Sequence, residues 1–388
     1  MQSPNPAVAA ARLSEIRNPK VEIRNKSEIR SPNGPAGHLF GFRISSFLRT
    51  SDFGLRTLAC LLLTTFLTAC KPSSEAPGAK SASPTLTIAV IPKGATHNFW
   101  KAIHAGALMA ASELGNIEIV WKSGLKEDDR DSQIKVVEDM ITRKVSGLVL
   151  APLDDAALRP AVEDAARSGI PTVIIDSDLK GQKYVSFVAT DNYLGGVKAG
   201  QLLAKLLNDK GRVVMLRCME GSASTMAREQ GWLDEIRTHP GIEVLSANQF
   251  GGAVTEAAYK VAENMLGRFR KSDGSLDVDG IFASNESTTF GMLRALQDNK
   301  WAGKVKFVGF DSSEMLVKAM ESQQLNGLIL QNPMKMGYLG VKTVVAHLRG
   351  EKVEKRIDTG ATVVTTENMN EPEIRKLLEP DIKRWLKE

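Results

Sequence analysis

The chain has 388 residues, of which 43% are hydrophobic and 24% charged, which is enough for two ordinary domains of a globular protein. Its net charge of +5 arises in residues 1–69, which carry nine Lys or Arg against four Asp or Glu, so the rest is balanced at 41 of each sign. A balanced body argues against nucleic-acid binding, which needs a basic surface, and three cysteines with five scattered histidines predict no disulfide scaffold, metal or cofactor.

Residues 1–40 lack a core-forming hydrophobic period. Glu-Ile-Arg recurs at 15–17, 22–24 and 28–30 within polar sequence that prolines interrupt. Low-complexity sequence of this kind does not bury enough apolar surface to fold. The segment fits either a start site assigned too far upstream or a genuine unstructured extension.

Residues 41–84 have the pattern of an export signal followed by a tether. Three arginines precede an apolar run over 58–67, which is too short to span a bilayer comfortably. The run ends in Leu-Thr-Ala-Cys at Cys70, which resembles a bacterial lipoprotein lipobox, and a flexible polar linker covers 70–84. We expect export to the periplasm or cell envelope and membrane attachment through lipidated Cys70. The alternative is cleavage elsewhere, with Cys70 incidental.

From residue 85 onward, short apolar runs alternate with segments of helical spacing. The apolar runs, interpreted as buried parallel strands, are Leu86–Ile91, Ile117–Trp121, Gly147–Leu150, Pro171–Ile175, Val185–Ala189, Arg212–Leu216, Glu243–Ser246, Gly280–Ala283, Val305–Phe310 and Leu325–Leu330. The predicted helices are Asn98–Leu114, Asp131–Thr142, Asp155–Ser168, Leu194–Leu207, Met226–Thr238, Thr255–Arg268, Thr288–Asp298, Ser313–Glu321, Met334–Arg349 and a last helical segment at Glu371–Glu388. Two successive series of this kind predict an α/β protein with two doubly wound parallel-sheet lobes.

Polar side chains follow the predicted strands, at the sheet edge where such folds bind ligands. They are Lys93, Asp176, Ser177, Asp178, Asp191, Asn192, Arg228, Asn285, Glu286, Asp311, Gln331 and Asn332, with Phe99 and Trp100 at the start of the first helix. Planar Asp, Asn and Arg groups can each bridge two adjacent hydroxyls, and aromatic faces pack against the C–H faces of a pyranose. The set therefore predicts a polyhydroxyl ligand.

In this order and spacing, the motifs resemble the ribose-binding-protein family of periplasmic sugar-binding proteins, from about Leu86 to Thr365. The motifs are His97-Asn98-Phe99-Trp100-Lys101, Val173-Ile174-Ile175-Asp176-Ser177, Thr190-Asp191-Asn192-Tyr193-Leu194-Gly195-Gly196, Gly221-Ser222-Ala223-Ser224 with Arg228-Glu229-Gln230-Gly231, Asn285-Glu286, Val308-Gly309-Phe310-Asp311 and Gln331-Asn332-Pro333.

The resemblance implies the type I periplasmic-binding-protein fold, with two lobes joined by a three-strand hinge near Asp191, Gln331 and Gly360. The first lobe would cover 85–190 and be completed by 332–360, and the second would cover 191–331 and be completed by 361–388. It implies that Phe99 and Trp100 stack on a sugar while Asp176, Arg228, Asn285, Asp311 and Gln331 bind its hydroxyls. The lobes would close on the ligand, and the protein, a monomer, would deliver it to the permease subunits of an ABC importer or to a membrane receptor.

Three positions depart from the ribose binders and leave the ligand open. Lys93 stands in place of a small hydroxyl residue, Ser177 in place of a sugar-holding Arg, and His97 in place of an Asn. Lys93 and Asp176 resemble instead positions of the related autoinducer-2-binding proteins, although Arg228 does not match them. We retain Lys93 and Ser177 as candidate ligand contacts. A monosaccharide, a polyol, an acidic sugar and autoinducer-2 remain alternatives, the last two with a role in sensing.

Each candidate also has an ordinary structural interpretation. Phe99 and Trp100 could be core residues, Arg228 could form a surface ion pair with Glu229 or Asp234, Asn285 and Asp311 could cap helices, Lys93 could be solvated, and His97 could lie at the surface. Cys218 is expected to be a buried apolar residue.

Two other classes of function are weaker. A sugar-modifying enzyme could use Asp176 and Asp311 as paired carboxylates, but the sequence has no Ser/His/Asp set or phosphate-binding glycine loop beside them. A transcription regulator on the same lobes needs a basic helix-turn-helix before Leu86, where the export signal and linker stand instead. We therefore expect a binding protein and not an enzyme.

Overall fold

The computed structural model of the chain describes residues 84–387. The low-complexity segment, the export signal, the lipidation site at Cys70 and nearly all of the linker are predictions that lie outside this range. Within it, no helix is both long enough and apolar enough to cross a membrane.

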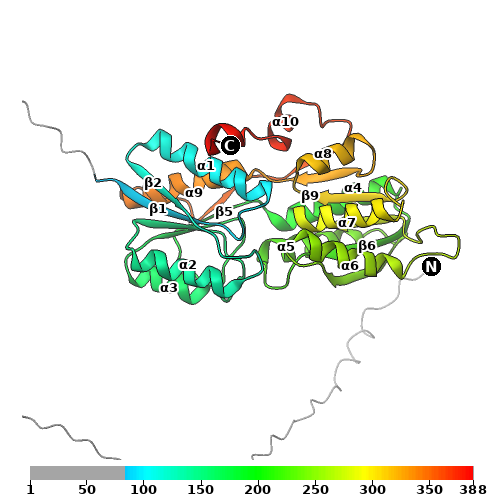
Figure 1. The fold of residues 1–388 in the computed structure, drawn as a ribbon, viewed down its shortest axis with the longest axis horizontal. Helices are drawn as coiled ribbons and strands as arrows, with labels where there is room; N and C mark the ends of the chain where they lie inside the picture. The colour runs from blue at the N-terminus through cyan, green and yellow to red at the C-terminus, as the bar shows by residue number, and fades with distance from the viewer. Residues whose placement is uncertain (1–83, 388) are drawn as a thin grey trace, which may run out of the picture. The chain divides into compact units, whose positions relative to one another are not determined.

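The first lobe is built on a six-stranded, fully parallel sheet. Its strands, in chain order, are β1 (Leu86–Ile91), β2 (Ile117–Trp121), β3 (Gly147–Leu150), β4 (Thr172–Ile175), β5 (Ser186–Ala189) and β11 (Arg356–Asp358). They lie in the order β2-β1-β3-β4-β5-β11. Helices α1 (Asn98–Leu114) and α9 (Pro333–Leu348) cover one face, and α2 (Arg130–Thr142) and α3 (Arg159–Arg167) cover the other (Figure 1).

The second lobe repeats this arrangement. Its strands are β6 (Gly211–Arg217), β7 (Ile242–Phe250), β8 (Gly280–Ala283), β9 (Lys306–Phe310), β10 (Gly327–Leu330) and β12 (Thr362–Val364). Their order is β7-β6-β8-β9-β10-β12, with only β12 antiparallel to its neighbour. Helices α4 (Asn192–Leu206) and α5 (Ala223–Ile236) cover one face, and α6 (Thr255–Gly267), α7 (Glu286–Asp298) and α8 (Glu314–Glu321) cover the other.

Burial on both faces explains why the strands are continuous apolar runs. In β1, Ile88 and Val90 pack with α1 and α9, whereas Ala89 and Ile91 pack with α2 and α3. All four side chains are fully buried. A strand covered by helices on both sides has no solvent face, so it cannot show the polar alternation of an open sheet.

The chain crosses between the lobes three times. It passes from β5 to α4, from β10 to α9 and from β11 to β12. The predicted fold class, two doubly wound α/β lobes joined by three connections, is confirmed.

Several predicted boundaries are wrong for local reasons. The helix expected over 155–168 begins only at Arg159, because Asp154 accepts the amides of Ala156 and Ala157 at 2.9 and 2.8 Å and holds a turn there. The strands β11 and β12 are not predicted, since each has only three residues and neither is an apolar run long enough to stand out.

The C-terminal segment is two short helices and not one. Pro380, which has no amide hydrogen to donate, lies between α10 (Pro372–Leu378) and α11 (Ile382–Leu386). Helix α10 buries Ile374 and Leu378 in the core of the second lobe, whereas α11 contacts α1 of the first. The segment therefore touches both lobes, as its course along one side of Figure 1 shows.

The contact between α1 and α9 depends on two glycines. A Cβ at Gly106 would lie 1.9 Å from the carbonyl oxygen of Met334, and one at Gly337 would lie 2.0 Å from that of Ile103. These partners are backbone atoms, so they cannot rotate away. The glycines thus set the close approach of two helices that are more than 200 residues apart in the chain.

We predict that Gly106→Ala lowers the free energy of unfolding by about 1–3 kcal/mol, because α1 and α9 must separate to accommodate the methyl group. Chemical denaturation measures this. The control is Gly267→Ala at the end of α6, where nothing lies within 4 Å of an added Cβ, so stability should stay level or rise by about 0.4–1 kcal/mol. Equal effects of the two substitutions would contradict the packing argument.

Candidate functional site

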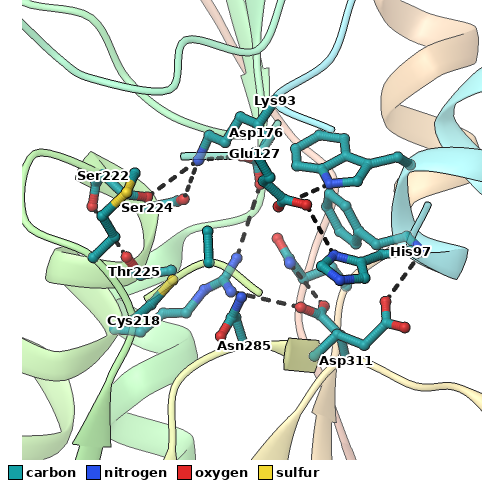
Figure 2. A pocket seen from close by; sticks show the side chains of 17 residues that line it. Lys93, His97, Glu127, Asp176, Cys218, Ser222, Ser224, Thr225, Asn285 and Asp311 are labelled. Carbon is teal, nitrogen blue, oxygen red and sulfur yellow. Dashed lines mark hydrogen bonds and ion pairs between the residues drawn. The ribbon is translucent and has the colours of Figure 1, made fainter. Parts of the chain in front are cut away.

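A small cavity of about 40 Å³ lies between the carboxyl ends of the two sheets, at the edge where folds of this kind bind ligands. Both lobes line it (Figure 2). The lining residues are Lys93, His97, Phe99, Trp100, Glu127 and Asp176 from the first lobe, Cys218, Met219, Ser222, Ser224, Thr225, Arg228, Ala253, Asn285, Glu286 and Asp311 from the second, and Gln331 at a crossing.

Two aspartates occupy equivalent positions in the two sheets. Asp176 follows β4, and Asp311 follows β9, the fourth strand of the second series. Both have left-handed backbone, with φ of 61° and 65°, and both amides donate to the neighbouring strand, at Val188 and Ile329. Left-handed conformations are uncommon outside glycine, and Asp adopts them more readily than most residues. The sharp turn leaves both carboxylates on the cavity wall.

Arg228 lies between these carboxylates and is 2% exposed. Its Nη2 is 3.9 Å from Asp176 Oδ1, and its Nη1 is 3.7 Å from Asp311 Oδ2. Nε donates to Asn192 Oδ1 at 2.8 Å, Nη1 donates to the Ser284 carbonyl at 3.0 Å, and the guanidinium stacks on Phe310. The surface ion-pair interpretation of Arg228 is therefore wrong. The guanidinium is held in place while its distances to both carboxylates exceed hydrogen-bond length.

Lys93 is buried and fully engaged. Its Nζ lies 2.9 Å from Asp176 Oδ2 and donates to Ser222 Oγ at 3.2 Å and to Ser224 Oγ at 3.1 Å. An ammonium group has three hydrogens to donate, and these three partners use them. The solvated interpretation of Lys93 is wrong. Since the two serines belong to the second lobe, Lys93 also links the lobes (Figure 2).

Phe99 and Trp100 open α1 and line the cavity. Their rings meet edge to face, with centroids 4.9 Å apart, and both also pack in the core of the first lobe. Trp100 Nε1 donates to Glu127 Oε1 at 3.0 Å. The aromatic pair is therefore both core and cavity wall, with the indole ring fixed by a carboxylate.

Asn285, Asp311 and Gln331 form the wall opposite. Asn285 caps α7 in a capping box with Thr288, so the capping interpretation is correct and the residue lines the cavity as well. Gln331 Nε2 donates to Asp311 Oδ1 at 2.8 Å, and burial raises the pKa of Asp311. Gln331 Oε1 is buried and has no hydrogen-bond partner among residues 84–387. It is an acceptor suited to a ligand hydroxyl.

The chain matches the periplasmic binding protein domain family over residues 88–352. It is 34% identical to the ribose import binding protein of Haemophilus influenzae over 286 residues, 74% of this chain and 93% of that protein. A solute-binding protein structure from Agrobacterium vitis with bound D-fucose superposes with a TM-score of 0.72 at 32% identity, over 75% of this chain and 99% of that one. The chain belongs to the ribose-binding family of periplasmic binding proteins.

The prediction that Ser177 contacts the ligand is not supported by its position. It does not line the cavity. Its side chain is fully buried, and Oγ accepts the amide hydrogen of Ser224 from the second lobe at 3.0 Å. The hydroxyl is therefore engaged in a contact between lobes, and we withdraw Ser177 as a candidate ligand contact.

Sequence reasoning missed an acidic cluster around His97. The ring Nδ1 lies 3.0 Å from Glu127 Oε2. Burial alone would lower the pKa of His97, but the hydrogen bond and charge of Glu127, with the charges of Glu286 and Asp311, raise it to about 9. The surface interpretation of His97 is thus wrong. Glu286 follows β8 and was noted among the strand-end residues, whereas Glu127 lies in the loop between β2 and α2, away from the strand end.

Burial also shifts the pKa of two other lining residues, Cys218 and Glu286. Cys218 is buried, as expected, and burial raises the pKa of its thiol to about 12. Burial also raises the pKa of Glu286 to about 7, with His97 opposing and Asp311 adding to the shift. An acid whose pKa lies this high in the folded protein binds a proton more readily there than in the unfolded chain.

The raised pKa of His97 predicts a pH-dependent stability. The folded value of about 9 exceeds the ordinary 6.5, so the stabilisation by the protonated ring is complete below pH 6.5 and is lost as pH rises through 9. The melting temperature should therefore fall less between pH 6.5 and 9 in His97→Gln than in the wild type. His347→Gln, at an exposed position in α9, should keep the wild-type profile. Parallel profiles for all three proteins would refute the assignment.

Proposed function

We propose that the chain is a monomeric solute-binding protein that encloses a neutral monosaccharide or polyol between its lobes and delivers it to an ABC importer. The observation that carries this is the buried guanidinium of Arg228, which lies 3.7–3.9 Å from two carboxylates of opposite lobes. A hydroxyl placed there can accept from Arg228 and donate to Asp176 or Asp311.

The relatives support a sugar as the ligand. Their names specify ribose in Haemophilus influenzae and ribose or allose in Pseudomonas aeruginosa. Solved structures at 32% identity contain D-fucose and D-arabinose. These ligands differ in ring and substituents but share adjacent hydroxyls, the feature that the paired Asp and Arg groups suit.

Charge favours a neutral ligand over an acidic sugar. The cavity gathers three cations, Lys93, His97 and Arg228, and four carboxylates, Glu127, Asp176, Glu286 and Asp311. Lys93, the cation that an acid would be expected to pair with, already has three partners. The other two cations also face carboxylates, His97 beside Glu127 and Arg228 between two aspartates. An added carboxylate would therefore lack a cation of its own, and a buried charge without a partner is costly.

The same contacts favour binding over catalysis. Asp176 is held by Lys93 and Asp311 by Gln331, and Arg228 lies between them. Each carboxylate already has a partner within the protein, whereas a glycosidase pair needs one protonated acid and one free base or nucleophile. The relatives are transport proteins by name, which favours import over sensing.

We also propose that the protein is held at the membrane by lipid on Cys70. Relatives of the periplasmic binding protein family indicate the periplasm or cell envelope as its location. The support for the anchor is the Leu-Thr-Ala-Cys sequence at Cys70, followed by the polar linker over 70–84. A tether of that composition would let the lobes open and close away from the membrane surface.

Binding is tested with purified protein and a panel of D-ribose, D-allose, D-fucose, inositols, sugar acids and autoinducer-2. A ligand at a hundred times its dissociation constant adds about 2.7 kcal/mol to stability, which a thermal melt detects. We expect a neutral sugar or polyol to shift the melt. A shift by a sugar acid alone would overturn the neutral-ligand assignment, and a shift by autoinducer-2 alone would overturn the assignment of a monosaccharide or polyol.

Asp176→Ala should weaken binding of the active sugar by about 2 kcal/mol, roughly 30-fold, because Lys93 and Arg228 lose a buried partner. Titration calorimetry measures the change. Asp277→Ala is the matched control: it also removes an aspartate paired with an arginine, Arg212, but outside the cavity, and affinity should not change. Unchanged affinity in Asp176→Ala would exclude the residue from the site.

The lipid anchor predicts that Cys70→Ser abolishes labelling by radioactive palmitate and releases the protein from the membrane fraction. Cys60→Ser, in the apolar run of the export signal, should leave both unchanged. Retention of Cys70→Ser in the membrane with its label would refute lipidation at this residue.

A further inference from the structure

Two helices that open onto the cavity begin without a side-chain cap of their own. The N-cap residues of α1 and α5 are His97 and Ser222, and neither accepts a hydrogen bond from its own helix. His97 faces Glu127 instead, and the Ser222 hydroxyl accepts from Lys93. The first amides of a helix have no acceptor within the helix, so another group must satisfy them.

In both helices that group comes from the opposite lobe. The amide of Phe99, the second residue of α1, donates to Glu286 Oε2 at 3.3 Å, and Glu286 opens α7 of the second lobe. The amide of Ser224, the second residue of α5, donates at 3.0 Å to Ser177 Oγ, which follows β4 of the first lobe. We call these two contacts the cross-lobe caps.

The cross-lobe caps are reciprocal. Helix α1 follows β1 and α5 follows β6, the first strand of each series, and the capped amide is the second of the helix in both. In five other helices the side chain of the N-cap residue accepts a hydrogen bond from an amide of the same helix. These N-cap residues are Asp129, Asp191, Asn285, Ser313 and Asn332. Each lobe therefore supplies the missing cap of the other lobe's first helix.

We propose that Ser177 and Glu286 are closure residues, whose caps form only when the lobes meet, so that Ser177 strengthens ligand binding without touching the ligand. This rests on the proposed function. An N-cap normally stabilises the helix that contains it. A cap from the opposite lobe stabilises the closed form alone, because opening removes the acceptor. It therefore contributes to affinity and leaves the open protein unaffected.

Charge and position support the two assignments. Glu286 places a carboxylate at the amino end of α1, where the helix dipole favours negative charge. At α5, Lys93 already reaches the hydroxyls of Ser222 and Ser224, and Ser177 supplies a neutral acceptor beside it. Glu286 lines the cavity and Ser177 does not. A substitution of Ser177 therefore tests the effect of closure without removing a side chain that lines the cavity.

The test compares Ser177→Ala with Ser313→Ala in the full chain. Both substitutions remove one serine acceptor of a helix amide, but Ser313 caps α8 within its own lobe. The readouts are the melting temperature without ligand, the dissociation constant for the sugar identified from the panel, and amide hydrogen exchange at Ser224 by NMR, with and without the sugar.

Ser177→Ala should weaken sugar binding about fivefold, the value of one typical cap, with an unchanged ligand-free melting temperature and with faster exchange at Ser224 in the sugar-bound protein. Ser313→Ala should lower the ligand-free melting temperature by roughly 2–4 °C and leave both other readouts as in the wild type.

The proposal is overturned if Ser177→Ala lowers the ligand-free melting temperature as Ser313→Ala does while affinity stays unchanged, since Ser177 would then act within one lobe. If no sugar on the panel binds, the proposed function fails separately. Exchange at Ser224 in the ligand-free protein still tests the proposal: the open form lacks the cap, so wild type and Ser177→Ala should exchange at the same rate, and slower exchange in the wild type would overturn it.

Discussion

The closed arrangement depends on how a buried guanidinium is neutralised. Arg228 is 2% exposed, and a charge that deep needs partners. Asp311 is supplied by its own lobe, but Asp176 comes from the other. Asp176 is itself held by an ion pair with Lys93, which also donates to two serines of the second lobe. Each charge is thus balanced across the cavity, and the two sheets face each other at the edge where both carry polar side chains.

Most of the fold follows from patterns that one lobe can satisfy alone. Apolar runs such as Leu86–Ile91 predict strands because both of their faces are buried, and strand-end residues such as Asp176 and Asp311 indicate the cavity because parallel strands end at one edge. What the sequence did not reveal depends on contacts between distant segments. The roles of His97 and Ser177 are set by Glu127 and by the amide of Ser224, and no local pattern specifies which distant group a side chain will meet.

The resemblance to a known family predicted well which positions line the cavity. It predicted poorly what a side chain does where this chain has a different residue from its relatives. It correctly located Arg228 and Gln331 on the cavity wall. It also suggested that Ser177, standing in place of a sugar-holding Arg, contacts the ligand, whereas a short hydroxyl side chain reaches only the neighbouring backbone. The cation at this part of the cavity is instead Lys93, which comes from another strand. Position carries over between relatives more reliably than role, because a change in side-chain length changes which atoms can meet.

The three crossings have a consequence for the order in which the molecule can assemble. The first sheet needs β11 at its edge, and α1 needs α9 against it through Gly106 and Gly337. Both parts are synthesised after strands β6 to β10 of the second lobe. The first lobe therefore emerges with an apolar helix face uncovered, and its completion requires contacts of very long sequence separation, which slow folding. The second lobe has strands β6 to β10 and the helices on both of its faces, α4 to α8, in one stretch of chain and lacks only β12 and α10. It can therefore serve as the folded body onto which the first lobe is completed.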